Sequence, residues 1–308
     1  MKHLLLASLL SAVLMPCSGY SQENQMAAPV KADQPSAMQL PGWLQRTKFG
    51  LDVGKEQKPR YYFETLQPLY QDDDLQNTLF IAPRINKSNA NASYGTYNIG
   101  LGFRRLMLDN AMMLGLNTFW DARTNHEHYR MGFGAEAFYK LLEFRANSYL
   151  AMSPQRLVSQ SGVYDTYERA VSGFDMEAGV PVPYMNWINV YGGMYWFDYR
   201  KSDNKTGWTA RAQISPLKYL TSNFTAFDDN KGSASYRIDT YFAIPFDSNG
   251  FAFGKDSVNV GIGDEAWPGR HDQSGKLLNR VERQYDIEVE KWAVNRVTGA
   301  TIEIKRGN

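Results

Sequence analysis

The fold is decided by the stretch YGTYNIGLGFR, residues 94–104. Every second side chain in it is apolar, and those between are polar or absent: Tyr97, Ile99, Leu101 and Phe103 against Asn98, Gly100, Gly102 and Arg104. Strict alternation is the side-chain period of a β-strand, whereas a helix would repeat its apolar residues every three or four positions. The stretch therefore predicts a strand with one apolar and one polar face.

The same period continues on both sides of this stretch. Similar runs lie at 112–121, 130–140, 142–150, 174–180, 208–214 and 236–244. Tight turns at 108–110 and 140–141 alternate with longer loops at 123–127 and 153–167. About twelve strands, each needing about 9–11 residues to cross a bilayer, fit into this part of the chain.

We therefore predict an all-β fold, a transmembrane antiparallel up-and-down β-barrel over residues 46–246. A soluble β-sandwich also alternates and is the competing interpretation. A slip of one residue would turn the charged face of each strand into lipid, so the pattern specifies the register.

The N-terminal residues predict export. A short basic start precedes an apolar run at 4–15, which is followed by Pro16 and small residues. This is the layout of a secretory signal peptide, and the run is shorter than the roughly 20 residues of a membrane-spanning helix. We expect residues 1–21 to be the signal peptide and 22–45 to be a flexible periplasmic lead. A buried N-terminal helix is the alternative.

Composition excludes several classes of function. Lys plus Arg number 33 and Asp plus Glu 32, a net charge of +1, so the chain has no basic excess for nucleic acid. The one cysteine, Cys17, excludes an intrachain disulfide and a four-cysteine zinc site. A lipoprotein signal has a small residue directly before the cysteine, and Pro16 occupies that position. We therefore expect Cys17 to be removed with the signal peptide.

Two histidines, His126 and His128, flank Glu127 in an expected loop. We interpret them as solvated loop residues, because no nucleophile and acid lie around them at a catalytic spacing and two ligands alone make a weak metal site. We expect no enzyme activity, no metal and no cofactor.

The polar face of the predicted strands carries equal numbers of basic and acidic side chains. Those expected to face the lumen are Arg104, Asp121, Arg130, Glu136, Lys140, Glu143, Arg145, Asp175, Glu177, Arg211, Arg237 and Asp239. Equal numbers predict cross-strand ion pairs and disfavour a pore selective for one sign of charge. Glycines in the same phase either make room for something in the lumen or relieve barrel curvature.

Residues 247–308 follow the last expected strand. The piece from 247 to 275 is rich in glycine and aspartate, 277–283 is compatible with a short helical turn, and 285–290 and 301–305 alternate briefly. With an even strand number both ends of a barrel lie on the periplasmic side, so a tail that reaches the surface must pass back through the pore. We expect 247–308 to be a linker or plug in the pore, followed by a short stub.

An ordered series of motifs resembles the barrel of the intimin/invasin, or inverse autotransporter, family. The motifs are GLGFRR at 100–105, LGLNTFWD at 114–121, GFGAEA at 132–137 and ANSY at 146–149, and RVERQYDI at 280–287 is similar to the linker that follows that barrel. The resemblance implies a twelve-stranded outer-membrane barrel, a linker through its pore and a passenger of immunoglobulin-like and lectin-like domains. Because the sequence given stops at Asn308, we expect the passenger to be missing.

Three functions remain open. A translocator would export or present a separately encoded secreted or surface protein, with outer-membrane lipid around it. A binding module would contact a host-cell surface ligand through loops such as 153–167 or 201–206, as in cell adhesion and virulence. A plugged or passive pore would do neither. We favour the translocator, and the resemblance carries no catalytic residue over to this chain.

Overall fold

The computed structural model describes residues 42–55, 57–88, 95–243, 246–247, 250–251, 258–267 and 272–304. The expected signal peptide and residues 22–41 of the expected lead lie outside this part of the chain. Residues Gly42–Gln45, expected to be flexible, form the short helix α2. Among the described residues, no helix is long and apolar enough to cross a membrane.

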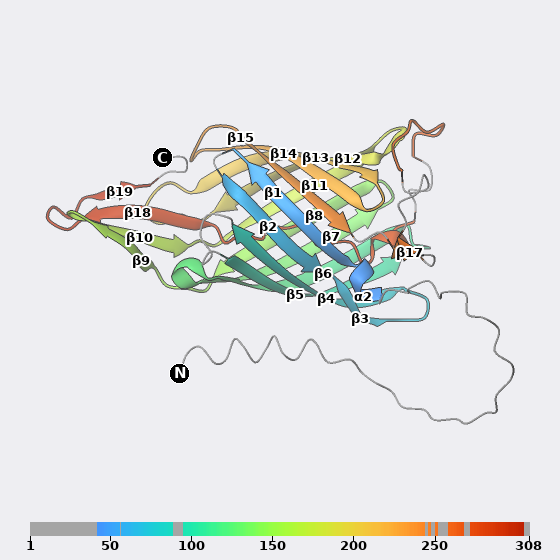
Figure 1. Ribbon diagram of the computed structural model, residues 1–308, viewed down its shortest axis with the longest axis horizontal. Coiled ribbons are helices and arrows are strands. Elements are labelled where there is room, and N and C mark those ends of the chain that lie inside the picture. The colour runs from blue at the N-terminus through green and yellow to red at the C-terminus, as the bar shows by residue number, and fades with distance from the viewer. Residues whose placement is uncertain are drawn as a thin grey trace, which may run out of the picture. The chain divides into compact units, whose positions relative to one another are not determined.

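The main sheet closes into an antiparallel barrel of twelve strands (Figure 1). These are β1 (Thr47–Gly54), β2 (Gln57–Thr65), β4 (Asn77–Ser88), β5 (Gly95–Met107), β6 (Met112–Arg123), β7 (His128–Tyr139), β8 (Leu142–Ala151), β11 (Gly173–Val182), β12 (Met185–Phe197), β13 (Lys205–Leu217), β14 (Leu220–Asp229) and β15 (Ser235–Ala243). The ring closes where β1 pairs with β15, and β3 (Gln67–Gln71) continues β2 along the other end of β4.

The outward-facing side chains of the barrel are mostly apolar and exposed. In β5 they are Ile99, Leu101 and Phe103, whereas Asn98 and Arg104 between them are buried. The alternation predicted from residues 94–104 is thus that of a barrel wall, apolar toward the lipid and polar toward the inside. Because lipid surrounds the wall of a transmembrane barrel, the exposed apolar side chains are not a defect of packing.

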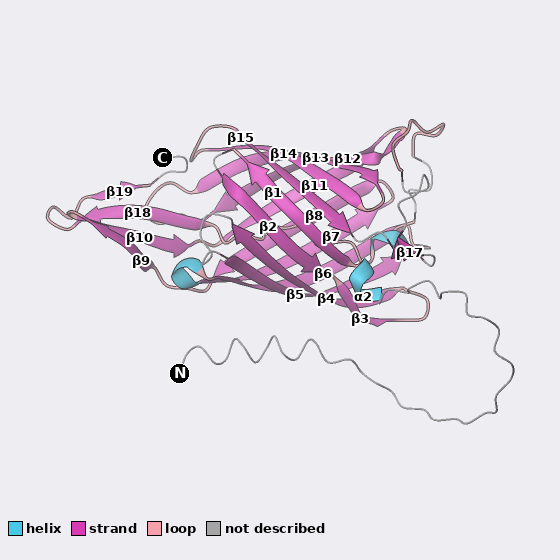
Figure 2. Ribbon diagram, viewed as in Figure 1, coloured by secondary structure: helices cyan, strands magenta, loops and turns pink. Residues whose placement is uncertain are grey.

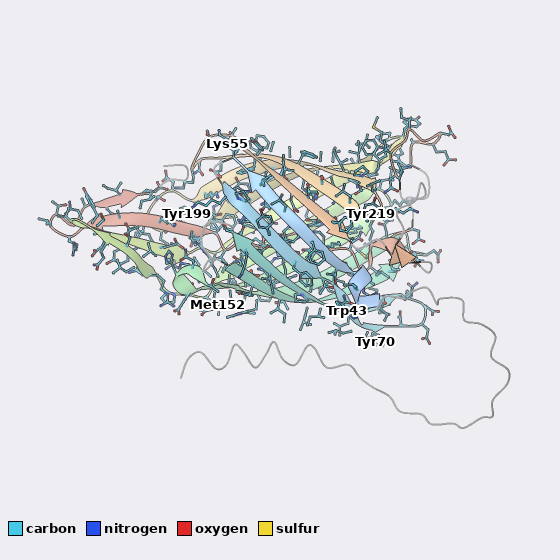
Figure 3. The ribbon with its side chains drawn as sticks, in the orientation of Figure 1. Trp43, Lys55, Tyr70, Met152, Tyr199 and Tyr219 are labelled. Atoms are coloured by element: carbon cyan, nitrogen blue, oxygen red, sulfur yellow. The ribbon has the colours of Figure 1, made fainter. Side chains whose placement is uncertain are left out.

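The two ends of the barrel differ in their connections. One end has tight turns between β5 and β6, β7 and β8, β11 and β12, and β13 and β14, and we call it the tight-turn end. The other end carries the longer connections, including η1 (Asn125–Glu127), and we call it the loop end. In Figure 3, Tyr199 lies at the loop end and Tyr219 at the tight-turn end.

A second sheet lies at the loop end (Figure 2). Its strand order is β19-β18-β10-β9, in which β9 (Arg156–Ser161) and β10 (Tyr164–Ala170) come from a surface connection and β18 (Val289–Asn295) and β19 (Thr301–Glu303) from the C-terminal segment. The connection expected at 153–167 is thus a long one, and within it residues 156–161 and 164–170 pair as a β-hairpin that the sequence did not predict. The alternation expected from residue 285 becomes a strand only at Val289.

Three short elements lie between β15 and β18. β16 (Phe246–Asp247) pairs with β17 (Gly250–Phe251), and the 3₁₀ turn η3 spans Ser274–Lys276. The helical turn expected at 277–283 thus lies slightly earlier, and residues 280–288 have no regular secondary structure.

Candidate functional site

One buried ion pair of the barrel joins β5 to β7. Arg104 is 1% exposed, and its Nε and Nη2 donate to the two carboxylate oxygens of Glu136 at 2.8 and 3.1 Å. The remaining nitrogen, Nη1, donates to the backbone carbonyls of Leu277 and Asn279 at 2.9 and 2.7 Å. One guanidinium therefore joins two barrel strands to the C-terminal segment.

A second buried arginine, Arg130 of β7, repeats this arrangement nearer the loop end. Its Nε donates to Asp121 of β6 at 2.8 Å, and both groups are fully buried. Its two other nitrogens donate to the carbonyls of Gln284 and Asp286 at 2.6 and 2.9 Å. Asp121 also accepts both terminal nitrogens of Arg283 at 2.9 and 2.8 Å.

The opposite wall carries a longer network of charges. Glu143 accepts from Arg145 at 2.7 Å and from Lys276 of the C-terminal segment at 2.6 Å. Arg145 reaches Glu177 at 3.2 Å, and Glu177 also accepts from Arg211 at 2.6 and 2.8 Å. Alternating signs along the wall leave no extended surface of one charge, as the equal numbers in the sequence predict.

Arg280 connects the segment to the strands on either side of the barrel closure. It donates to Asp239 of β15 at 3.1 Å and lies 3.7 Å from Glu64 of β2. The phenol of Tyr62 donates to Asp239 at 2.6 Å and accepts from Arg280 at 3.1 Å. Charged groups on β2 and β15, the two strands that flank β1, therefore hold the segment together with those on β5–β8.

Apolar side chains of the segment fill the gaps between these ion pairs. Leu277 packs in a buried cluster with Met113 and Phe138. Val281 packs in another with Phe80 and Phe119. Burial of these side chains against inward-facing aromatic rings adds a hydrophobic contribution to the charged contacts.

The contacts of the segment follow its sequence from one barrel end to the other. Gln273 bonds the turn carbonyls of Asn110 and Lys140 at the tight-turn end. Residues 276–286 bond the inward-facing charges described above, and Glu288 accepts from Lys205 at 2.9 Å at the loop end. Val289 then begins β18. The inward-facing groups of the barrel therefore form a continuous series of partners for residues 273–288.

Close approach of this segment explains one of the inward-facing glycines. A Cβ at Gly132 would lie 2.5 Å from the guanidinium of Arg283, so only glycine leaves room for that group. At Gly100 the space is instead filled by the ring of Phe119, at 2.3 Å. The glycines thus accommodate both the segment and neighbouring aromatic side chains.

Space remains on one side of the segment. A cavity of about 440 Å³ lies between residues 280–288 and the wall built largely from β11 to β15. Its lining mixes both signs, including Asp175, Glu177, Arg211 and Arg237. No single ligand chemistry follows from such a lining.

Ten of the twelve charges expected to face inward take part in these ion pairs or hydrogen bonds. Asp175 is among them and accepts from Tyr149 at 2.6 Å and Asn147 at 2.8 Å. Arg237 lines the cavity, but its side chain has no ion-pair partner among the described residues. The expectation that Lys140 faces the lumen is wrong. Lys140 is an exposed residue of the β7–β8 turn with a φ of 53°, where the strand alternation has ended.

The sequence analysis missed a buried pair on β2 and β4. Arg84 donates to Glu64 at 2.5 Å, and its guanidinium lies 3.6 Å from the centre of the Tyr62 ring. The alternation of Ala82, Arg84 and Asn86 in one phase was the available signal. Pro83 lies between Ala82 and Arg84, on the other face of the strand, and weakens that pattern because proline is unusual inside a strand.

A charged cluster outside the barrel was also missed. Glu168 of β10 is fully buried and lies 3.2 Å from Arg123, 3.1 Å from His128 and 2.9 Å from Lys291 of β18. The interpretation of His128 as a solvated loop residue is wrong, since the hairpin covers it completely, while His126 keeps partial exposure at 3.5 Å from Glu168. Among the described residues, no group of three or more His, Cys, Asp or Glu could hold a metal ion.

The charges around Glu168 also set its protonation. Burial by itself would raise the pKa of Glu168, but the hydrogen bond with His128 and the charges of Arg123 and Lys291 lower it to about 2. Beside it, Glu290 of β18 accepts from Arg169 at 2.8 Å and from the backbone nitrogen of Lys201 at 2.6 Å. The C-terminal segment is therefore held at the loop end by ion pairs as well as by strand pairing.

Comparison with known proteins gives consistent results. The family described as inverse autotransporter, beta-domain, matches residues 20–243. An attaching and effacing protein homolog of Escherichia coli (strain K12) is 33% identical over 115 residues, which is 37% of this chain and 36% of that protein, so the match spans about a third of the relative's length.

One of the solved structures compared with this chain has a similar fold. A chain from work on the in-meso crystallization of membrane proteins has a TM-score of 0.61 and 18% identity, covering 80% of this chain and 99% of that one. The KdgM porin has a TM-score of 0.43 and 4% identity, covering 64% of this chain and 97% of the porin. The first of these likenesses supports the fold, and the second is too distant for an argument.

Proposed function

Since the chain belongs to the inverse autotransporter β-domain family and is an outer-membrane β-barrel, we propose that it is a translocator that holds its own C-terminal segment in the lumen and presents protein at the cell surface. In this proposal residues 273–288 are the linker, and the tight-turn end faces the periplasm. The second sheet then stands outside the cell, where β18 and β19 fold onto the β9–β10 hairpin.

The observation that carries this proposal is the way Arg104 and Arg130 contact the segment. Between them they donate to five backbone carbonyls, those of Lys276, Leu277, Asn279, Gln284 and Asp286. Every polypeptide carries such carbonyls, and a charged donor is a strong partner for them. A lumen lined with donors of this kind suits an extended chain better than a small solute.

Surface exposure of an inserted epitope tests the orientation. A short tag at Gly299, an exposed glycine in the β18–β19 turn, should bind antibody on intact cells. The matched control is the same tag at Asp109 in the β5–β6 turn, which should bind only after the outer membrane is permeabilised. The proposal fails if the tag at Gly299 also requires permeabilisation while the barrel is present in the membrane.

The proposal extends to a separately encoded protein as cargo. An outer-membrane barrel does not by itself determine which protein is exported. A lumen that already holds one polypeptide segment supports the export of another polypeptide. Quantitative mass spectrometry of surface and secreted proteins would compare wild type, a deletion strain and a complemented strain. Loss of one or two proteins outside, with accumulation in the periplasm, is the expected result. Unchanged surface and secreted proteins would remove export of a partner from the proposal.

Direct adhesion is the second candidate, because the tip of the β9–β10 hairpin exposes apolar side chains. Val163 and Tyr164 are exposed there, and Leu157 is exposed farther along β9. A host-cell ligand would bind this tip. Replacement of the tip by a polar turn should abolish cell binding while the tag at Gly299 stays accessible, and unchanged cell binding would argue against this candidate.

A further inference from the structure

A ten-residue segment before η3, residues 258–267, follows the rim of the barrel at the tight-turn end. Backbone hydrogen bonds fix it there: Asn259 donates to the carbonyl of Pro216 at 2.9 Å, and Gly263 donates to the carbonyl of Tyr184 at 2.8 Å. Tyr184 in turn donates to the carbonyl of Ala266 at 2.9 Å. The segment therefore has a defined position beside the β11–β12 and β13–β14 turns.

The side chains of this segment alternate in character. Val258, Val260 and Ile262 are exposed, and Ile262 is 79% exposed. Asn259, between two of them, turns toward the barrel and donates to the carbonyl of Ser215 at 3.2 Å. Val258, Val260 and Ile262 therefore present exposed apolar surface, which we call the apolar face of the segment.

This apolar face continues the lipid-facing wall of the barrel. Val258 bridges to Leu217 at the end of β13, and exposed Val180 lies on the outer side of neighbouring β11. Two indoles also join the segment to the wall: Trp187 donates to the carbonyl of Gly261 at 2.9 Å, and Trp267 contacts that of Pro181 at 3.4 Å. Tryptophan is enriched where apolar lipid meets water, because its ring is apolar and its N–H is polar.

We propose that residues 258–267 are a lipid-binding foot, whose Val258, Val260 and Ile262 insert shallowly into the leaflet at the tight-turn end of the barrel. The exposed carboxylates of Asp264 and Glu265 stay in water and limit the depth of insertion. The foot widens the membrane contact of the barrel beside β11 to β14, which is the wall next to the internal cavity. It depends on the outer-membrane location and on no assumption about cargo.

Spin labels test the foot in the full-length protein. A nitroxide on cysteine at position 262, in a Cys17→Ser chain, would be measured in vesicles of phosphatidylethanolamine and phosphatidylglycerol. Power saturation compares its accessibility to oxygen, which partitions into lipid, with that to a water-soluble nickel complex. The reference sites are Leu116, an outward-facing residue of β6 that is 67% exposed, and Val297 in the β18–β19 turn, which is 80% exposed.

The ratio of oxygen to nickel accessibility at 262 should exceed that at 297 several-fold and stay below that at 116. A label at Val260 should behave like the one at 262, which guards against a local disturbance by either substitution. A ratio at both positions equal to that at 297 would overturn the proposal, since the foot would then lie in water. Low accessibility to both reagents would overturn it too, because a protein rather than lipid would cover the face.

Discussion

The two walls of the barrel interior use the same alternating pattern but differ in how tightly they hold the C-terminal segment. On the β5–β7 wall, Arg104, Asp121 and Arg130 are almost completely buried and bind the segment directly. On the β11–β15 wall, the carboxylate of Glu177 is 18% exposed, and the cavity of about 440 Å³ separates much of the wall from the segment. One wall binds the chain, and the other leaves room beside it.

This difference separates two roles that inward-facing charges can have. On the β11–β15 wall, Glu177 and Arg211 neutralise each other across strands, while Asp239 and Lys205 pair with side chains of the segment. On the β5–β7 wall, Arg104 and Arg130 have nitrogens that donate to backbone carbonyls of the segment. Loss of the segment would therefore leave these buried donors unpaired on the β5–β7 wall, at a cost of about 1–3 kcal/mol each.

The largest expected effect follows from Arg104→Ala. This change leaves Glu136 buried without its partner and removes the donor to three carbonyls of the segment, so it should lower the free energy of unfolding by about 3–5 kcal/mol. Urea unfolding of the purified barrel in detergent measures it. The matched control is Arg237→Ala on the opposite wall, where the loss should stay within about 1 kcal/mol. Equal losses would mean that the two walls do not differ as described.

A smaller effect is expected from Asp121→Asn, which keeps the shape of the side chain but removes its charge. The replacement amide carries no charge and has one acceptor oxygen in place of two, so the ion pairs with Arg130 and Arg283 are lost and stability should fall by about 1.5–3 kcal/mol. Single-channel recordings in planar bilayers should show more frequent opening than in wild type. Glu177→Gln serves as the control, because the ion-pair partners of Glu177 are Arg145 and Arg211 on the barrel strands and not groups of the segment. Identical recordings for both variants would contradict a tighter hold by the β5–β7 wall.

A local effect of pH is expected at the loop end. Because the pKa of Glu168 is about 2 against an ordinary 4.5, its contribution to stability is fully present above pH 4.5 and is lost as the pH falls toward 2. The protection of the β18 amides, measured as exchange relative to the intrinsic rate at each pH, should therefore fall over that range before the protection in β5–β7 does. Glu168→Gln should exchange faster at neutral pH and lose most of this pH dependence. A pH response in Glu168→Gln equal to that of wild type would refute the assignment.

The smallest effect is expected at Lys140. The strand pattern places this lysine inside the barrel, whereas the structure places it in an exposed turn. Lys140→Gln should thus change stability by no more than about 0.5 kcal/mol and leave single-channel recordings unaltered. A loss comparable to that of Asp121→Asn would show that Lys140 faces the interior after all.

The sequence alone predicts the barrel because each strand faces lipid on one side and the polar interior on the other. Ile99 and Leu101 are apolar where lipid surrounds them, and Asn98 and Arg104 are polar where the interior does, so the period is visible residue by residue. Inward placement of Arg104 and Glu136 follows from the same period. Lys140 was misplaced because the period says nothing about where a strand ends.

Partners far apart in the chain could not be predicted in this way. Glu168 meets His128 and Lys291 only because a surface hairpin pairs with residues 289–295, and no local pattern encodes that pairing. The carbonyl contacts of Arg104 and Arg130 are invisible for another reason: the accepting groups belong to the backbone and are the same in every sequence.

The pairing of β18 with β10 also has a mechanical consequence. Ala170, where β10 rejoins the barrel, pairs with Val289, and the far end of the same ladder pairs Tyr164 with Asn295. A pulling force that reaches Asn295 from outside is resisted at Ala170, at the opposite end of the ladder. It therefore acts along the two strands in shear, and their hydrogen bonds are loaded together rather than opened one after another.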